Sequence, residues 1–109
     1  MSRHFIHMDH GDRKITVVSG FDRPLQSLFL HVVYADLPPW QEDQFLYDSL
    51  DEPAADWTDI NTVADRLDAL GITVPPSLIE SIFLDQCFNA GNRVVEHHAD
   101  LQPTVLHAG

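Results

Sequence analysis

Two apolar runs near the N-terminus constrain the fold of this 109-residue chain most strongly. Residues 15–19 are rich in β-branched side chains, and residues 28–34 form a second apolar run. Because side chains alternate along a strand, the second run is apolar on both faces, with Phe29 and Val33 on one and Leu30 on the other. A strand of this kind needs cover on both sides, from the fold or from a partner.

The connections around these runs are short, which predicts an antiparallel β-meander. Gly11 lies in a turn signal at 9–12, and Pro24 delays the start of the following strand. Phe45 and Tyr47 favour a short additional strand. The predicted strands are about 3–8, 13–19 and 25–34, with a fourth over 45–48.

Helical spacing dominates the second half of the chain. Apolar residues recur every three or four positions over 59–70, where Thr58 or Asp59 is the expected N-cap. A second stripe predicts a helix over 77–97, opened by a capping box at Ser77 and with Cys87 in the core. We therefore predict an α+β domain over residues 1–98, with an αα-hairpin on one sheet face, and a loosely ordered tail over 99–109.

Charge is the most unusual bulk property. Seventeen acidic residues face six basic ones, a formal net charge of −11. A field of this sign repels phosphate backbones and acidic membrane surfaces, so direct nucleic-acid or membrane binding is not expected. One cysteine, no secretory signal pattern and no apolar run long enough to span a bilayer together predict a cytoplasmic protein.

Acidic and aromatic residues are concentrated between the third strand and the first helix. Seven acids with no intervening base lie over 36–56, interleaved with large rings. Aromatic side chains are enriched at interface cores, and charge of one sign steers a complementary partner. The predicted partner-binding residues are Asp36, Trp40, Glu42, Asp43, Phe45, Tyr47, Asp48, Asp51, Glu52 and Asp56. Trp57 fits this surface and a packed position equally well.

Other candidate chemistry has a structural explanation. His4, His7 and His10 have a spacing that suits a metal on a helix, but a strand sends the first two to opposite faces. His31 in an apolar strand is better explained as a hydrogen-bonded structural histidine than as part of a cleft. The sequence has no nucleotide-binding or nucleophile motif, so neither a cofactor nor an enzymatic activity is predicted.

These observations predict a small acidic adaptor or inhibitor that binds a basic surface of a partner protein. One alternative is a nucleic-acid mimic that inhibits a nucleic-acid-binding protein or nuclease. Another is a metal-binding protein that uses the N-terminal histidines. A homodimer through the uncovered sheet face around Phe29 and Val33, or through the sheet edge, is a further alternative.

Overall fold

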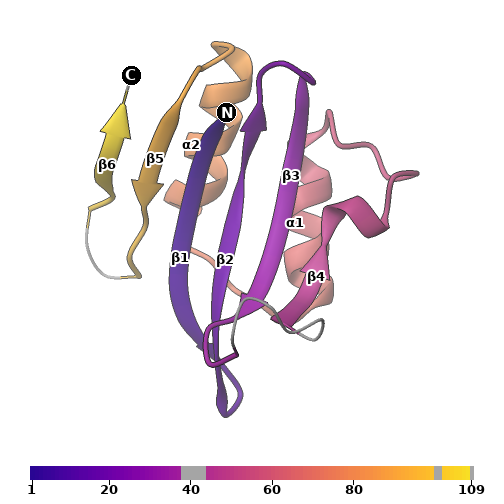
Figure 1. Ribbon diagram of the computed structural model, residues 1–109, viewed down its shortest axis with the longest axis vertical. Helices are drawn as coiled ribbons and strands as arrows, with labels where there is room; N and C mark the ends of the chain where they lie inside the picture. The colour runs from indigo at the N-terminus through magenta and orange to yellow at the C-terminus, as the bar shows by residue number, and fades with distance from the viewer. Residues whose placement is uncertain (38–43, 100–101, 109) are drawn as a thin grey trace.

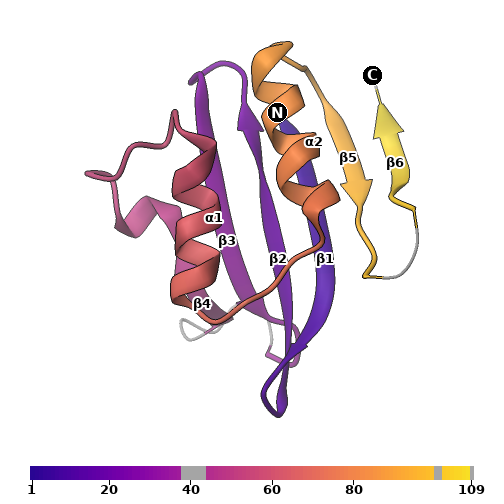
Figure 2. The same cartoon turned by 180° about the vertical axis from the view of Figure 1, so that it is seen from behind.

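The structure is a computed structural model that describes residues 1–37, 44–99 and 102–108, with side chains described through residue 106. Within these ranges, two helices cover one face of a six-stranded mixed sheet (Figure 1, Figure 2). In chain order the elements are β1 (Ser2–His10), β2 (Arg13–Asp22), β3 (Ser27–Tyr34), β4 (Phe45–Asp48), the 3-10 helix η2 (Ser49–Asp51), α1 (Ile60–Ala69), α2 (Pro76–Cys87), β5 (Arg93–Glu96) and β6 (Thr104–Ala108).

The strands lie in the order β4-β3-β2-β1-β5-β6. The first four pair antiparallel, and the β1–β2 turn is possible because Gly11 takes a left-handed conformation with φ of 65°. The chain then crosses over through α1 and α2, so that β5 pairs parallel with β1, and β6 pairs antiparallel with β5. Figure 1 shows this crossover behind the sheet and the C-terminal strand at its outer edge. The predicted α+β class is confirmed, whereas the predicted meander agrees only roughly, because β5 and β6 extend the sheet.

The core lies between the sheet and the helices. Alternate side chains of β1, β2 and β3 point toward the helices, and the inward positions of both helices meet them. The buried apolar residues at the centre of this layer are Ile6, Ile15, Val17, Leu30, Val32, Val63, Leu67, Leu78 and Ile82. Because of the same alternation, the remaining strand side chains point to the opposite face of the sheet, which α1 and α2 do not cover.

The prediction of one helix over 77–97 is wrong. The helix α2 ends at Cys87, Asn89 turns the chain with a left-handed φ of 53°, and residues 93–96 form β5 instead. Two adjacent β-branched residues, Val94 and Val95, suit the strand that pairs with β1. The tail predicted to be loosely ordered over 99–109 contains a further strand, β6.

The expected inward stripe of α2 also needs correction. The buried positions of this helix are Leu78, Ile82 and Asp85, so a carboxylate occupies a core position. Cys87, predicted to be buried, is exposed, as is Phe83. The predicted capping box at Ser77 does not form either, because the N-cap is Pro75 and the helix begins with Pro76, which is preorganised for a first turn.

Candidate functional site

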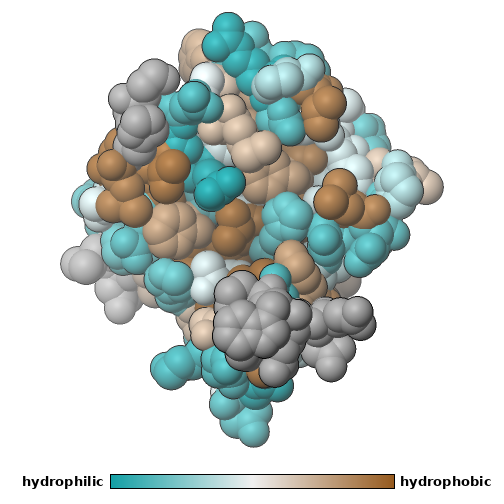
Figure 3. Space-filling view, viewed as in Figure 1, coloured by the Kyte–Doolittle hydropathy of each residue, from teal (hydrophilic) through white to brown (hydrophobic). Residues whose placement is uncertain are grey.

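The face of the sheet away from the helices carries a groove. Its volume is about 680 Å³, within the roughly 300–1,000 Å³ typical of binding sites. Figure 3 shows this face, with apolar surface in a hollow at its centre and hydrophilic side chains around it. The main apolar side chains of the lining are Val18, Phe29, Val33, Phe45, Leu50 and Trp57.

The groove is the direct consequence of the two-sided apolar strand. In β3, Leu28, Leu30 and Val32 are buried, whereas Phe29 and Val33 alternate with them and are only half-buried. Neither α1 nor α2 packs on that second face, and the short 3-10 helix η2 contributes only Ser49 and Leu50 to the groove lining. The lining therefore keeps large apolar side chains in contact with solvent, which is uncommon unless a surface binds something.

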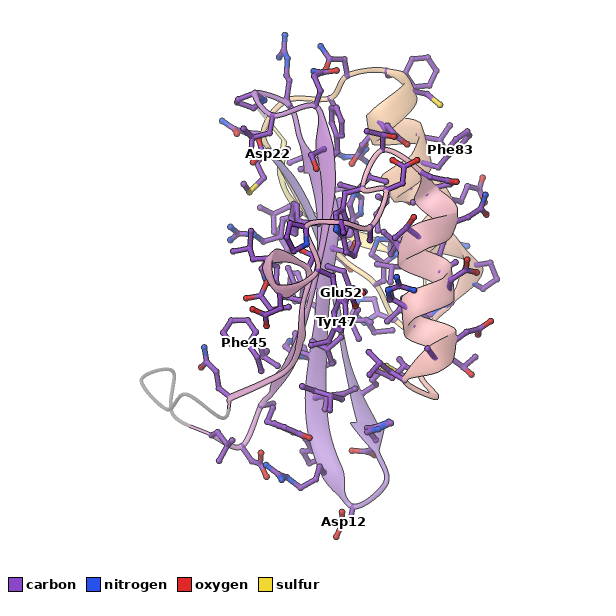
Figure 4. The ribbon with its side chains drawn as sticks, turned by 90° about the vertical axis from the view of Figure 1, so that its right-hand side faces the viewer. Asp12, Asp22, Phe45, Tyr47, Glu52 and Phe83 are labelled. Carbon is purple, nitrogen blue, oxygen red and sulfur yellow. The ribbon has the colours of Figure 1, made fainter. Side chains whose placement is uncertain are left out.

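Three of the apolar residues that line the groove form its rim and are unusually exposed. Leu25 and Leu50 are 74% and 78% exposed, and Phe45 is 40% exposed. Figure 4 shows Phe45 on the side of the sheet opposite the helices, and Phe83 on the outer side of the helix layer. The groove and its rim thus form one apolar surface, which we call the open face.

His31 lies on the open face rather than in the core. Its ring lies between those of Phe29 and Phe45, with centroid distances of 5.5 and 5.9 Å. The Nδ1 atom is 3.2 Å from Asp48 Oδ1, close enough for an ion pair when the imidazole is protonated, but no hydrogen bond forms in acceptable geometry. His31 therefore differs from the hydrogen-bonded structural histidine that the sequence suggested.

Charged side chains surround the open face unevenly. Arg3 and Asp22 contribute to the lining itself. Asp48 borders the groove beside His31, and the exposed Asp51 follows Leu50 in the chain. The acids near Leu50 therefore combine a negative field with an exposed apolar side chain, the pairing of features expected of a docking surface.

The remaining predicted partner-binding residues lie in different environments. Asp36 accepts two hydrogen bonds of 3.0 Å from Arg13, whose guanidinium holds the pKa of that carboxyl below its usual range. Glu52 is 3.2 Å from Arg66 Nε. Hydrogen bonds from Thr58 hold the pKa of the Asp56 carboxyl below its usual range. Trp40, Glu42 and Asp43 lie outside the described residues.

The two aromatic residues that follow Phe45 point toward the protein. Tyr47 packs against the core, and its buried hydroxyl has no hydrogen-bond partner. Burial, together with the nearby Glu52 carboxylate, raises the pKa of Tyr47 to about 12. Trp57 also packs against the core and lines the groove, and its Nε1–H donates to the Glu52 carbonyl at 2.9 Å. Phe45 is thus the described ring of this segment that presents the most surface.

The three N-terminal histidines do not share a face. His4 points inward and is buried, whereas His7 is exposed and bonds Thr16 Oγ1 at 2.8 Å. His10 is the last residue of β1. Among the residues that the structure describes, no group of three histidine, cysteine or acidic side chains is arranged to hold a metal ion.

Sequence reasoning missed a buried polar chain that joins β1, α2 and the end of β5. Ser77 Oγ is 3.1 Å from His97 Nδ1, and His97 Nε2 is 2.9 Å from His4 Nδ1. His4 Nε2 then lies 2.5 Å from Asp85 Oδ2, and Arg93 donates to Asp85 Oδ1 at 2.8 Å. We call these five side chains the histidine relay.

The relay is closed to solvent along most of its length. His4, His97 and Asp85 are 0%, 1% and 2% exposed. Burial lowers the pKa of His97 to about 4, and the positive charges of His4, His98 and Arg93 add to this effect. Burial would raise the pKa of Asp85, but the hydrogen bond from His4 and the charge of Arg93 outweigh it and hold this pKa below its usual range.

The relay has the connectivity of a nucleophile, a base and an orienting carboxylate. However, none of its side chains lines the groove, and its histidines are sealed beneath α2. The relay is therefore closed to an external substrate, whereas the open face is accessible from solvent.

Comparisons with known proteins add no family to these observations: no protein-family model matches the chain, and no curated protein or solved structure matches it significantly. Within the described residues, no helix is long and apolar enough to cross a membrane.

Proposed function

We propose that this protein is an acidic, non-enzymatic interaction module, an adaptor or inhibitor that binds a partner protein through the open face. The observation that carries the proposal is the groove of about 680 Å³ with exposed Leu25, Phe45 and Leu50 on its rim. Interface hot spots cluster in well-packed pockets that are desolvated on binding. The proposed partner surface keeps Phe45, Asp48 and Asp51 from the set predicted from the sequence and adds side chains of β3.

The partner segment that fits this surface has apolar anchors flanked by Lys or Arg. The groove offers room for leucine-sized or aromatic anchors, and the acids at Asp48 and Asp51 would meet basic residues beside them. The net charge of −11 also attracts a positively charged partner at longer range. Anchors would determine the dissociation rate, and charge would mainly determine the association rate.

An apolar groove favours this partner over the nucleic-acid mimicry alternative. A phosphate-mimicking surface needs rows of solvent-facing carboxylates, whereas the lining here is mostly apolar with Asp22 as its acid. Mimicry remains an outcome of the test. Suppose that this protein competes with nucleic acid for a nucleic-acid-binding partner and that Phe45→Ala does not change this competition. Mimicry would then replace the present proposal.

A defined peptide tests the docking surface directly. The probe is a 12-residue peptide of alternating leucine and arginine, and the matched probe replaces each leucine with serine. We expect the first peptide to shift the backbone amide NMR signals of Phe29, His31 and Val33, and the serine peptide to bind at least about tenfold more weakly. Equal binding of both peptides, or shifts confined to α1 and α2, would contradict the proposal.

A matched pair of variants separates the groove from other exposed apolar surface. Phe45→Ala removes a 40% exposed ring on the open face, and Phe83→Ala removes a 44% exposed ring on the outer side of α2. We expect Phe45→Ala to weaken peptide binding by about tenfold and Phe83→Ala by less than twofold. If light scattering instead shows a dimer that Phe45→Ala dissociates, the groove would belong to a second copy of the chain.

A further inference from the structure

The histidine relay is a closed set of hydrogen bonds whose direction depends on its protons. With both imidazoles neutral, Ser77 donates to His97 Nδ1, His97 Nε2–H donates to His4 Nδ1, and His4 Nε2–H donates to Asp85. With one extra proton on His4, this ring donates to both neighbours, and His97 Nδ1–H donates to the Ser77 hydroxyl. Every hydrogen bond is kept in both states, so the relay can accept one extra proton without losing a hydrogen bond.

A second extra proton has no place in this geometry. On His97, it puts an N–H on Nε2 that faces the N–H on His4 Nδ1 at 2.9 Å, so that hydrogen bond is lost between two buried cations. On Asp85, the second proton neutralises the carboxylate that accepts hydrogen bonds from both His4 and Arg93. Either site leaves buried polar groups unpaired, which costs far more inside the protein than at its surface.

The elements that meet at the relay are not equally well anchored. The helix α2 also buries Leu78 and Ile82 in the core. By contrast, β5 pairs with β1 over only four residues and buries Val95 as its single fully buried apolar side chain. The outermost strand β6 pairs with β5 alone among the described strands. Val105 and Leu106 in β6 are more than half exposed. Few buried contacts mark β5 and β6 as a weakly anchored edge of the sheet.

We propose that the histidine relay is an acid-sensitive latch that holds β5 and β6 on the β1 edge, and that its second extra proton releases these strands while the rest of the fold persists. Release would uncover the backbone edge of β1 from Ser2 to Phe5. The titratable and charged groups around the latch are His4 on β1, Asp85 on α2, and Arg93 and His98 on and after β5. The proposal is independent of the groove.

Hydrogen exchange measured by mass spectrometry between pH 7 and pH 4.5 tests the latch, with rates corrected for the intrinsic effect of pH. We expect the protection of amides 93–97 to fall by about tenfold for each pH unit below about 6, as one proton taken up on opening requires. Amides of 15–18 and 28–32 should keep their protection. Loss of protection in all strands at the same pH would show global unfolding and overturn the latch.

Two variants and one direct measurement complete the test. His97→Gln keeps one donor and one acceptor but cannot titrate, so its β5 protection should be nearly independent of pH, whereas the exposed-histidine control His7→Gln should follow the wild type. If His97→Gln does not fold, imidazole ¹⁵N spectra of the wild type decide. Protonation of His97 should coincide with loss of β5 protection, and protonation without that loss would overturn the proposal.

Discussion

At the scale of single residues, the Tyr47 hydroxyl is the clearest unsatisfied group. It is buried and makes no hydrogen bond of acceptable geometry, although Glu52 and Arg66 lie beside it, and the pKa of the phenol is raised to about 12. Removing such a group recovers its desolvation cost, so we expect Tyr47→Phe to raise the free energy of unfolding by about 0.5–1 kcal/mol at pH 7. Urea denaturation of both proteins measures this change, and a loss above about 1 kcal/mol would mean that the hydroxyl has a partner.

The same residue makes a pH-dependent prediction. An unfolded tyrosine ionises near pH 10, whereas folded Tyr47 ionises near pH 12, so the folded state binds more protons between these values. The free energy of unfolding of the wild type therefore falls as pH rises from about 10 toward 12. We expect the stability difference between Tyr47→Phe and the wild type to widen from pH 9 to pH 11. A constant difference would show that Tyr47 ionises normally.

Gly20 is required by the close approach of β1 to β2. A Cβ at this position would overlap the carbonyl oxygen of Ser2 and lie 3.1 Å from the Phe29 ring. We expect Gly20→Ala to lower the free energy of unfolding by about 3 kcal/mol, because the obstacle is backbone rather than a flexible side chain. Gly11→Ala is the control, since nothing lies within 4 Å of its Cβ and its cost is the left-handed φ alone, about 1 kcal/mol. Equal losses in the two variants would rule out the clash.

Residue patterns predicted some of these positions and not others. Strand alternation placed His4 and His7 on opposite faces, which the structure confirms. That rule does not reveal what His4 faces, because Asp85 and His97 are more than 80 residues away in the chain. A signal was present, since Asp85 interrupts the apolar stripe of α2 and His4 alternates with the buried Ile6. A polar residue at a core position predicts a buried partner without naming it.

At the scale of elements, the start of α1 has a testable cap. The Asp59 side chain accepts a hydrogen bond of 2.9 Å from the Asn61 amide, as the sequence predicted for Thr58 or Asp59. We expect Asp59→Ala to lower the free energy of unfolding by about 1 kcal/mol. Asp65→Ala, at an exposed position inside the same helix, should change it by less than about 0.5 kcal/mol, because it removes no cap. Thermal denaturation of the two variants measures the difference. Equal losses of stability would show that Asp59 does not cap the helix.

Periodicity identified elements where one period clearly dominated. The strands β1 to β3 and helix α1 lie near their predicted positions, although β2 continues past the predicted 13–19 to Asp22. In the segment after Cys87, apolar residues at Ala90 and Val94 fit a helical spacing by coincidence. What ends α2 is the left-handed Asn89 and the pairing of β5 with β1, a long-range contact that no local pattern contains.

At the scale of the whole molecule, charge makes stability and binding respond to salt in opposite directions. Seventeen acids face six bases, and four of those bases, Arg13, Lys14, Arg66 and Arg93, already lie beside acids. The surplus carboxylates repel one another in the folded state, and salt screens this repulsion. We expect the Tm to rise by a few degrees between about 20 mM and 500 mM NaCl.

Binding of a basic partner by the open face should respond in the reverse sense, because the same salt screens attraction. The leucine–arginine peptide should therefore bind several-fold more weakly at 500 mM NaCl while the protein itself becomes more stable. Asp51→Lys, at an exposed acid beside Leu50, tests both effects in one variant, since it should reduce the rise in Tm and weaken the peptide at low salt. If the Tm falls with salt instead, ion pairs such as Arg13–Asp36 outweigh the repulsion, and the surplus charge would not be what directs a basic partner to this face.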